Sequence, residues 1–385
     1  MKTIPLACIL CVLWAANGFS QAPDVLWTKY FSKDSLHNDK TGDQNGIRSH
    51  YIIETQDKGF AITGHCCCYH CTGDLFAMKT DSAGRIVWSQ RFDDNDKDEV
   101  GNCIQQTADG GYIIGGVTEG SLFIIRTDAL GNETWRRIYS KSGTYFGSIY
   151  SLRVTFDNGF IASGYSFPVG SGSSDAYLLR LDSNGDTLWT KTFGGSAHDW
   201  GRCVQQTQDS GFIICGATNA CGAGQEDLYF IRTNASGNTL WTKQFGKPEV
   251  NSGGYYIAQM QDNGFAVVGH TNDYQDIYLL RTNANGDTLW TKTIGADSTT
   301  EWGRSLKLMP DGGFLIGGLI GVNRPSGYLV RTDASGNVAW TKVLDNGKRT
   351  LIMGMELTSD NGIVVTTRIH TGSTAEDGFD VIKLK

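Results

Sequence analysis

The chain has 385 residues, of which 40% are apolar and 11% aromatic, so it is long enough to bury a large core. Its formal net charge is -7 and its isoelectric point is near 5.5, so the chain is acidic overall. No segment of the sequence carries a run of Lys and Arg. This composition excludes nucleic acid as an expected partner.

The N-terminus has the layout of a cleaved secretory signal. Lys2 is followed by an apolar run from Ile4 to Ala16 and then by a short stretch of mostly small residues. The run is too short to span a bilayer stably. We therefore expect residues 1–20 to be removed as a signal peptide. The mature chain, 21–385, is expected to be secreted or periplasmic, with no transmembrane segment and in a compartment where disulfides can form.

A tryptophan returns about every 50 residues, each time in the frame Trp-Thr-Lys-x-Phe or a close variant. The seven copies are Trp27, Trp88, Trp135, Trp189, Trp241, Trp290 and Trp340. Such self-similarity is typical of propellers and other arrays, in which no unit can bury its apolar face alone. The expected tryptophan strands lie near 25–31, 86–92, 133–139, 187–193, 239–245, 288–294 and 338–344. Their indoles are expected to pack in the seams between units and to bind no ligand.

Each unit contains four short apolar or alternating runs separated by turn residues, as in residues 201–245. Four strands in each repeat, without helical periodicity, indicate a propeller blade. The first turn reads Asp-x-Gly, in which the Asp side chain can bond the backbone and Gly is expected to adopt the left-handed conformation. These turns are Asp57/Gly59, Asp109/Gly111, Asp157/Gly159, Asp209/Gly211, Asp262/Gly264, Asp311/Gly313 and Asp360/Gly362. The predicted fold is all-β, a single seven-bladed β-propeller domain of four-stranded antiparallel blades over 21–385.

The way the ring closes can also be predicted. A second turn, Asp or Asn with Gly three residues later, precedes every tryptophan strand except the first, and the last unit has none. The sequence ends there, at Lys385, one strand short of a complete blade. We therefore expect the strand at 25–31 to complete the last blade, which leaves no open sheet edge.

The stretch Arg-Thr-Asp-Ala-Ser-Gly-Asn-Val-Ala-Trp-Thr-Lys, residues 331–342, resembles the tryptophan-docking repeat of quinoprotein-like propellers. Its turn is also similar to the Asp-box turn of sialidase-like propellers. The whole unit resembles the Trp-containing repeats of secreted Bacteroidetes-type propeller proteins, over nearly all of residues 25–385. These resemblances imply the propeller fold, but a fold does not carry a function.

The segment His65-Cys66-Cys67-Cys68-Tyr69-His70-Cys71 departs most from the composition of the other units. Such residues could bind a soft metal, but a tetrahedral site usually takes ligands from two separated spans, and the chain has no partner Cys-x-x-Cys. We expect a local disulfide among Cys66, Cys67, Cys68 and Cys71, such as Cys68 with Cys71 or Cys66 with Cys71, and no metal. Adjacent cysteines are also similar to the vicinal disulfide of some quinoprotein dehydrogenases.

Because both tight turns of each unit occupy one face, the longer and more variable loops must share the other, where a rigid scaffold commonly carries function. Two segments after tryptophan strands combine a carboxylate, an aromatic residue and Arg. They are His198, Asp199, Trp200 and Arg202, and Glu301, Trp302 and Arg304. Such groups could hold a sugar or an anion through bidentate bonds and stacking. Packing at the start of a strand is the preferred interpretation, because the tryptophan position is simply apolar in other units, and binding is the alternative.

Two further sets of residues recur at fixed positions and are expected to be structural. An arginine in the third strand is expected to pair with a neighbouring turn Asp. These arginines are Arg126, Arg180, Arg232, Arg281 and Arg331. Cys103 and Cys203 share one position in the first strand of their units and are expected to be buried thiols.

The predicted function is a secreted, non-catalytic and monomeric scaffold for an unknown protein or carbohydrate ligand, with no cofactor and no assigned catalytic residue. The alternative is a glycan-active hydrolase or lyase, in which Asp199 with Glu301 or Glu99 does acid/base work. A quinoprotein-like dehydrogenase is the remote third hypothesis, implied by resemblance alone.

Overall fold

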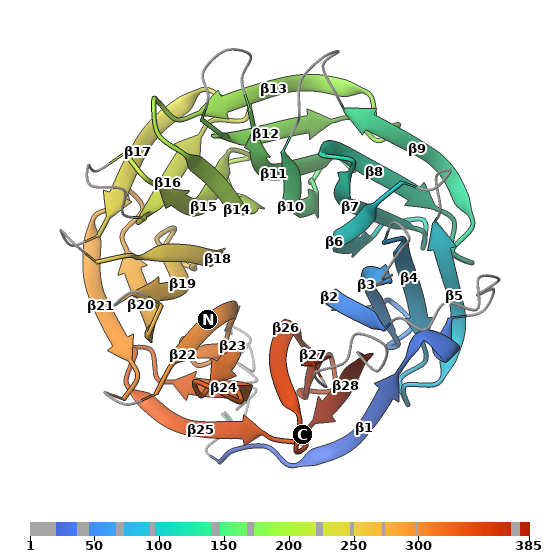
Figure 1. Cartoon of the computed structure of the whole chain (residues 1–385). Coiled ribbons are helices and arrows are strands. Elements are labelled where there is room, and N and C mark those ends of the chain that lie inside the picture. Colours follow the sequence, from blue (N-terminus) through green and yellow to red (C-terminus); the bar gives the residue numbers. More distant parts are fainter. Residues whose placement is uncertain are drawn as a thin grey trace, which may run out of the picture.

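The computed structural model describes residues 21–36, 46–66, 73–92, 97–139, 147–167, 173–220, 226–246, 250–271, 274–296, 299–370 and 378–385. The described strands form seven four-stranded antiparallel sheets, which stand around a central channel as the blades of a ring (Figure 1). The predicted seven-bladed β-propeller is therefore confirmed. Among the described residues, a single short 3-10 helix, η1 (Lys33–Ser35), follows the first strand. Within this part of the chain, no helix is long and apolar enough to cross a membrane.

Each blade runs outward from the channel. The innermost strands are β2 (Ile47–Glu54), β6 (Glu99–Gln106), β10 (Ser148–Val154), β14 (Asp199–Gln206), β18 (Gly253–Gln259), β22 (Glu301–Leu308) and β26 (Arg349–Leu357). The second strands are β3 (Phe60–Cys66), β7 (Tyr112–Thr118), β11 (Phe160–Ser166), β15 (Phe212–Thr218), β19 (Phe265–Thr271), β23 (Phe314–Ile320) and β27 (Ile363–His370). The innermost strands line the channel, and the second strands pair with them on the outer side.

The outer half of each blade consists of its third and fourth strands. The third strands are β4 (Leu75–Thr80), β8 (Ser121–Thr127), β12 (Asp175–Leu181), β16 (Asp227–Thr233), β20 (Asp276–Thr282), β24 (Ser326–Thr332) and β28 (Gly378–Leu384). The outermost are β5 (Ile86–Phe92), β9 (Glu133–Tyr139), β13 (Thr187–Phe193), β17 (Thr239–Phe245), β21 (Thr288–Ile294), β25 (Val338–Leu344) and β1 (Val25–Phe31). These outermost strands occupy the ranges expected for the tryptophan strands.

The N-terminal strand closes the ring, as predicted. The last sheet has the order β1-β28-β27-β26, so the first and last described strands pair within one blade (Figure 1). The backbone N–H of Asp24 donates to the carbonyl of Lys385 at 3.0 Å, and Lys385 returns the bond at 2.9 Å. This reciprocal pair stands where the other blades have a covalent turn.

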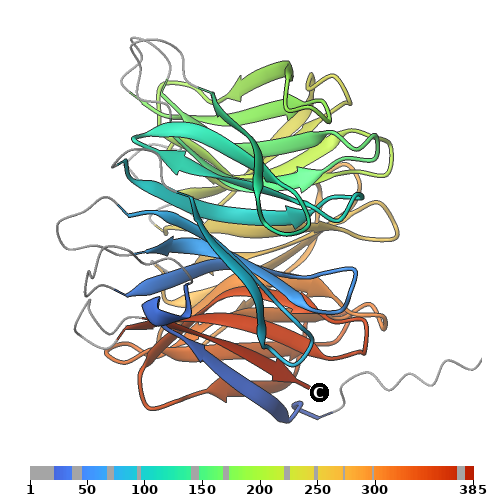
Figure 2. The same ribbon diagram turned by 90° about the vertical axis from the view of Figure 1, so that its right-hand side faces the viewer.

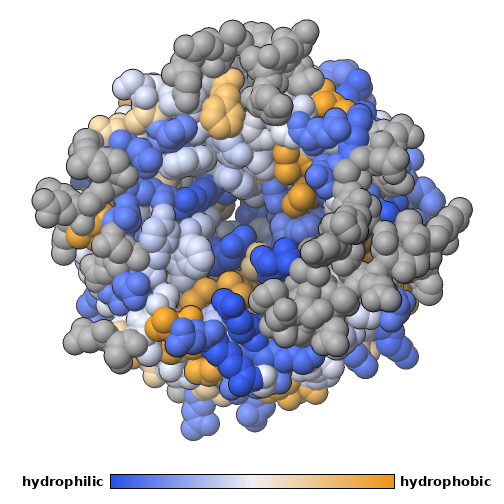
Figure 3. Space-filling model, viewed as in Figure 1, coloured by the Kyte–Doolittle hydropathy of each residue, from blue (hydrophilic) through white to orange (hydrophobic). Residues whose placement is uncertain are grey.

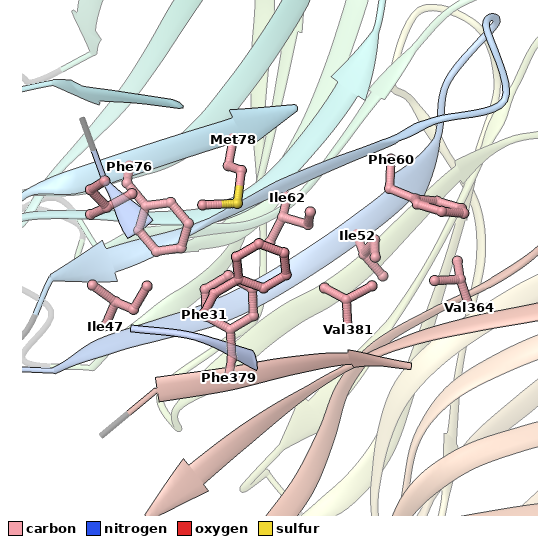
Figure 4. Packing of buried hydrophobic residues seen from close by; sticks show 11 residues of the cluster. Phe31, Ile47, Ile52, Phe60, Ile62, Phe76, Met78, Val364, Phe379 and Val381 are labelled. Atoms are coloured by element: carbon pink, nitrogen blue, oxygen red, sulfur yellow. The ribbon is translucent and has the colours of Figure 1, made fainter. Parts of the chain in front are cut away.

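The tryptophans pack between blades, as expected. Trp88 lies edge to face with Tyr112 of the next blade at 5.4 Å, and its indole contacts the turn at Gly131 of that blade. The seam between the last and first blades shows the same principle, with Phe31 and Phe379 packed among residues of β2, β3 and β4 (Figure 4). The core is therefore a series of seams between adjacent sheets, which explains why one blade cannot fold alone.

The two tight turns of each blade lie along one face of the ring (Figure 2). The predicted reason for the glycine of the first turn was wrong. The left-handed residue is the one before it, such as Gly110 with φ 86 or Asn158 with φ 61. Gly111 is required because a Cβ there would lie 2.3 Å from the carbonyl oxygen of Thr127.

The predicted pairing of third-strand arginines with turn aspartates is confirmed, within the same blade. Arg126 Nη2 lies 2.6 Å from Asp109 Oδ2. The other pairs are Arg180 with Asp157, Arg232 with Asp209, Arg281 with Asp262 and Arg331 with Asp311. Lys79 and Lys383 take the place of arginine in the first and last blades. These side chains belong to the scaffold.

Cys103 and Cys203 are buried thiols, as expected. The predicted disulfide falls mainly on Cys67, Cys68 and Cys71, which lie outside the described residues, and Cys66 ends β3. The predicted signal peptide, 1–20, also lies outside them.

Candidate functional site

Every innermost strand has a β-bulge at the same level of the channel. In each, the pairing with the second strand skips one residue, and a bulge re-aims the side chains at that point. The skipped residues are His50, Asn102, Tyr150, Arg202, Tyr255, Arg304 and Met353. All seven line one cavity, and we call them the bulge ring. The scaffold therefore supplies one variable side chain from each blade to a common space.

The cavity has a volume of about 360 Å³, which lies within the usual size of small-molecule sites. Figure 3 shows the mouth of the channel at the centre of the ring, with hydrophilic residues around it. The remaining lining residues are Tyr51, Ser151, Arg153, Cys203, Tyr256, Trp302 and Ser305. Among the described residues, the lining contains three arginines and no carboxylate, so the wall carries net positive charge.

Arg202 is held in place by Glu226, which lies just before β16. Arg202 Nη2 donates to the Glu226 carboxylate, and the Tyr274 hydroxyl donates to the same carboxylate at 2.5 Å. The guanidinium carbon lies 4.5 Å from the centre of the Tyr255 ring, a cation–π contact. Arg202 Nη1 is buried and has no hydrogen-bond partner among the described residues. One N–H edge of this guanidinium is thus fixed while the other is unsatisfied.

Arg304, on β22, makes no hydrogen bond or ion pair with any described residue and is exposed to the cavity. Burial among protein atoms lowers the pKa of its guanidinium, and the nearby Arg202 and Arg368 lower it further. An arginine nevertheless stays charged at neutral pH. Arg202, although paired with Glu226, and Arg368 therefore both repel the guanidinium group of Arg304.

Trp302 belongs to a cluster of contacting aromatic side chains beside these arginines. Its ring meets Tyr255 at 5.2 Å and 80°, and meets Tyr274 at 6.0 Å and 89°. His270 stacks on Tyr274 at 4.0 Å. Burial, and then Arg202, lower the pKa of His270 to about 3, so this imidazole is neutral. The cluster gives the cavity a fixed apolar surface next to its positive charge.

A second group of polar side chains comes from the first two blades. His50 Nδ1 lies 3.1 Å from Asn102 Oδ1, while Asn102 Nδ2 donates to Ser148 Oγ at 3.0 Å and to the Ile149 carbonyl at 2.8 Å. Burial, and then the neighbouring His65, lower the pKa of His50 well below its usual value. His50 is therefore a neutral imidazole at the cavity wall.

Arg153 narrows the channel below the bulge ring. It reaches from the third blade to the hydroxyl of Tyr51 in the first at 2.8 Å and to that of Tyr256 in the fifth at 3.0 Å. A second hollow of about 560 Å³ lies beyond this level, near the Lys307–Glu356 ion pair. Arg153 and Tyr256 line both hollows, so they separate the bulge-ring cavity from the hollow near the tight turns.

The structure divides the binding residues predicted from the sequence into two groups. Arg202, Trp302 and Arg304 line the cavity, but they lie on innermost strands rather than in loops. His198, Asp199, Trp200 and Glu301 do not line it. His198 stacks on Trp200 with ring centres 5.8 Å apart, and its Nδ1 accepts the backbone N–H of Ser174 at 3.1 Å.

The carboxylates proposed for acid/base catalysis lie at the first residues of innermost strands, where they accept hydrogen bonds from the protein itself. Asp199, 2% exposed, accepts the backbone N–H of Gly195 at 3.2 Å. Glu301, 3% exposed, accepts the hydroxyl of Thr299. Glu99 accepts the hydroxyl of Thr118 at 3.2 Å. None of the three lines the cavity, so they are not placed to act on a ligand there.

Sequence reasoning missed the other members of the bulge ring, in particular His50, Asn102, Tyr150 and Tyr255. A signal for them exists in the repeat. The bulge position holds five different kinds of residue in the seven units, while its neighbours stay small or apolar. Such variation at one position of a regular repeat is typical of a binding surface on a fixed scaffold.

The ring, its closing strand and the bulge-ring cavity define a seven-bladed β-propeller with a ligand-sized space in its channel. No protein-family model matches the sequence, and no curated protein matches it significantly. Among solved structures, the chain is similar to an ulvan lyase of polysaccharide lyase family PL25. The identity is 11%, the TM-score 0.52, and the match covers 76% of this chain and 79% of that one.

Two further solved structures are similar at lower TM-scores. NanB with Optactamide has 10% identity and a TM-score of 0.48, over 90% of this chain and 69% of that one. Puromycin hydrolase has 12% identity and a TM-score of 0.41, over 86% of this chain, which spans only 59% of that protein. At these identities the similarities concern the propeller fold and not the site.

Proposed function

We propose that this protein is a secreted propeller that binds an anionic carbohydrate, a sugar carrying a carboxylate, in the bulge-ring cavity without transforming it. The observation that carries the proposal is the lining itself, which has three arginines and no carboxylate among the described residues. Arg304 and the Nη1 group of Arg202 have no partner among those residues. Arg304 therefore presents N–H groups to the cavity, and Arg202 keeps one N–H edge without a hydrogen-bond acceptor.

A carboxylate is the group that satisfies these donors best. Arginine binds it through two parallel N–H bonds, which neutral hydroxyl groups cannot match. A carboxylate about 4 Å from one guanidinium gains about 4 kcal/mol of Coulomb energy at an effective dielectric constant of about 20. It would also relieve the repulsion between Arg202 and Arg304 that lowers the pKa of Arg304.

The rest of the lining fits a sugar ring. Trp302, Tyr150 and Tyr255 offer flat apolar faces, and Ser151 and Ser305 offer hydroxyl groups at the same level. Sites for small polar molecules usually combine such apolar walls with a few placed polar groups. The predicted signal peptide supports an extracellular or periplasmic ligand.

The alternative is an enzyme that acts on an acidic glycan. His50, Tyr150 and Tyr255 line the cavity and could transfer protons, and the similar ulvan lyase is a polysaccharide lyase. However, burial raises the pKa of Tyr255 even though Arg202 opposes this, and burial also raises the pKa of Tyr150. Both phenols are therefore protonated at neutral pH, and the lowered pKa of His50 makes this imidazole a weak base, so binding without reaction is the preferred function.

The test compares acidic and neutral sugars on the purified mature protein by titration calorimetry. D-glucuronate and D-galacturonate should bind, and D-glucose and D-galactose should bind much more weakly. Affinity for the acids should fall as salt rises. Equal affinity for both groups would contradict the proposal. Release of products from glucuronate- or galacturonate-containing polysaccharides would support the enzyme instead.

A further inference from the structure

Two cysteines face each other across adjacent strands of the fourth blade. Cys203 on β14 is the direct antiparallel partner of Cys215 on β15. The equivalent pairs in the other blades are Tyr51 with Thr63, Cys103 with Gly115, Ser151 with Ser163, Tyr256 with Val268, Ser305 with Gly317 and Gly354 with Thr366. Only the fourth blade therefore has a thiol on both strands at this level.

The register brings the two thiols within bonding reach. Directly paired residues of antiparallel strands have Cα atoms about 4.5 to 5.5 Å apart, within the range of about 4.4 to 6.8 Å that disulfides span. The Cys215 thiol donates a hydrogen bond to the sulfur of Cys203, and neither residue is bridged. The two side chains therefore share one face of the sheet, and no bond joins their sulfur atoms.

The two thiols differ in environment. Cys203, itself only 3% exposed, follows the bulge residue Arg202 and lines the cavity, whereas Cys215 is fully buried. The hydrogen bond from Cys215 lowers the pKa of Cys203 to about 6 against the effect of burial, and Arg153 lowers it further. Burial raises the pKa of Cys215. Cys203 is thus the thiolate-forming member at the cavity wall, and Cys215 stands behind it.

We propose that Cys203 and Cys215 form a redox-active dithiol, which a small disulfide that enters the bulge-ring cavity converts into an intrachain disulfide. The Cys203 thiolate attacks one sulfur of the small disulfide, forms a mixed disulfide and releases one thiolate. Cys215 then loses its proton, attacks the sulfur of Cys203 and displaces the second thiolate. The protein loses two electrons and two protons, and one small disulfide becomes two thiols. This inference does not depend on the proposed sugar ligand.

The probe for the experiment is bis(2-hydroxyethyl) disulfide, which is small and uncharged. Trypsin leaves both cysteines on one peptide, residues 203–232, because no Lys or Arg lies between Arg202 and Arg232. Cys221 lies on the same peptide, so the protein carries Cys221→Ser. The folded protein is reduced, freed of reductant, treated with the probe, and then alkylated in denaturant. The expected product is a peptide two hydrogens lighter than the dithiol, which takes two alkyl groups only after reduction.

Single variants separate the roles of the two thiols. Cys215→Ser should stop at the mixed disulfide on Cys203, because no second thiol can resolve it. Cys203→Ser should leave Cys215 unmodified while the protein is folded. Cys103 is the matched internal control, since it occupies the same repeat position opposite Gly115 and burial raises its pKa to about 12. It should be alkylated to the same extent with and without the probe.

The unsubstituted pair decides the question even if a single variant folds poorly. If the peptide of the Cys221→Ser protein still takes two alkyl groups after treatment with the probe, the inference is wrong. Attack at Cys215 before Cys203, or equal reaction of Cys103, would also overturn it. Near-ultraviolet circular dichroism before alkylation checks that the protein remains folded throughout.

Discussion

Truncation of Phe31 tests how the closing strand holds the ring. Strand β1 exposes most of its apolar side chains, including Leu26 at 54%, but Phe31 is 4% exposed and stacks on Phe379 of β28 at 5.2 Å (Figure 4). Phe31 is therefore the main apolar anchor of β1. Replacing a buried Phe by Ala costs about 3 to 5 kcal/mol, from lost burial and the cavity left behind.

We expect Phe31→Ala to lower the free energy of unfolding by about 3 to 5 kcal/mol, measured by denaturant titration with circular dichroism and tryptophan fluorescence. Leu26→Ala, on the same strand but exposed, is the matched control and should change it by at most about 0.5 kcal/mol. Deleting residues 21–33 should lower the melting temperature sharply. Equal stability of Phe31→Ala and Leu26→Ala would refute the closure argument.

Three further predictions concern the scaffold. Gly111→Ala should destabilise the protein by about 1 to 3 kcal/mol, because its Cβ would meet the Thr127 carbonyl, whereas Gly195→Ala has open space and should be neutral in the same titration. His270 has a pKa near 3 in the folded state, so the unfolded chain takes up its proton first as pH falls below about 6.5. As pH falls, His270 should therefore lower the free energy of unfolding by at most about 1.4 kcal/mol per pH unit. The substitution His270→Gln should make this pH dependence less steep. Despite partial burial, hydrogen bonds from Thr55 and Lys79 lower the pKa of Asp57 to about 2. Its contribution should be complete above about pH 4 and should be lost as pH falls toward 2, in acid titrations that compare the protein with Asp57→Asn.

The fold was predictable because each residue that recurs in the repeat has one structural role, which it fulfils with nearby residues. The tryptophans fill the seams, and the turn aspartates hold the third-strand arginines, as the pair Asp109 and Arg126 shows. The role of the first-turn glycines was misjudged. Gly111 looks like a residue chosen for its backbone angles, but its neighbour Gly110 takes the left-handed conformation. The close approach of a third strand cannot be seen in the turn sequence itself.

The site was only partly predictable because a bulge changes which side chains share a face. A shift of one residue in register moves a side chain to the other face of a strand. Asp199 and Arg202 are close in sequence, yet the first is buried at the start of its strand and the second lines the cavity. Nothing in the repeat points to Glu226 as the partner of Arg202, because it comes from a loop of variable length.

The central claim is that the arginines of the bulge ring bind a carboxylate, and titration calorimetry of Arg304→Ala with D-glucuronate tests it most directly. Arg85→Ala is the control, since Arg85 is exposed on the rim and pairs with Asp81 away from the cavity. Loss of one charge-assisted contact of about 1.5 to 3 kcal/mol should weaken binding roughly 10- to 100-fold in Arg304→Ala, while Arg85→Ala should bind like the unsubstituted protein. Undiminished glucuronate affinity in a correctly folded Arg304→Ala protein would contradict the account.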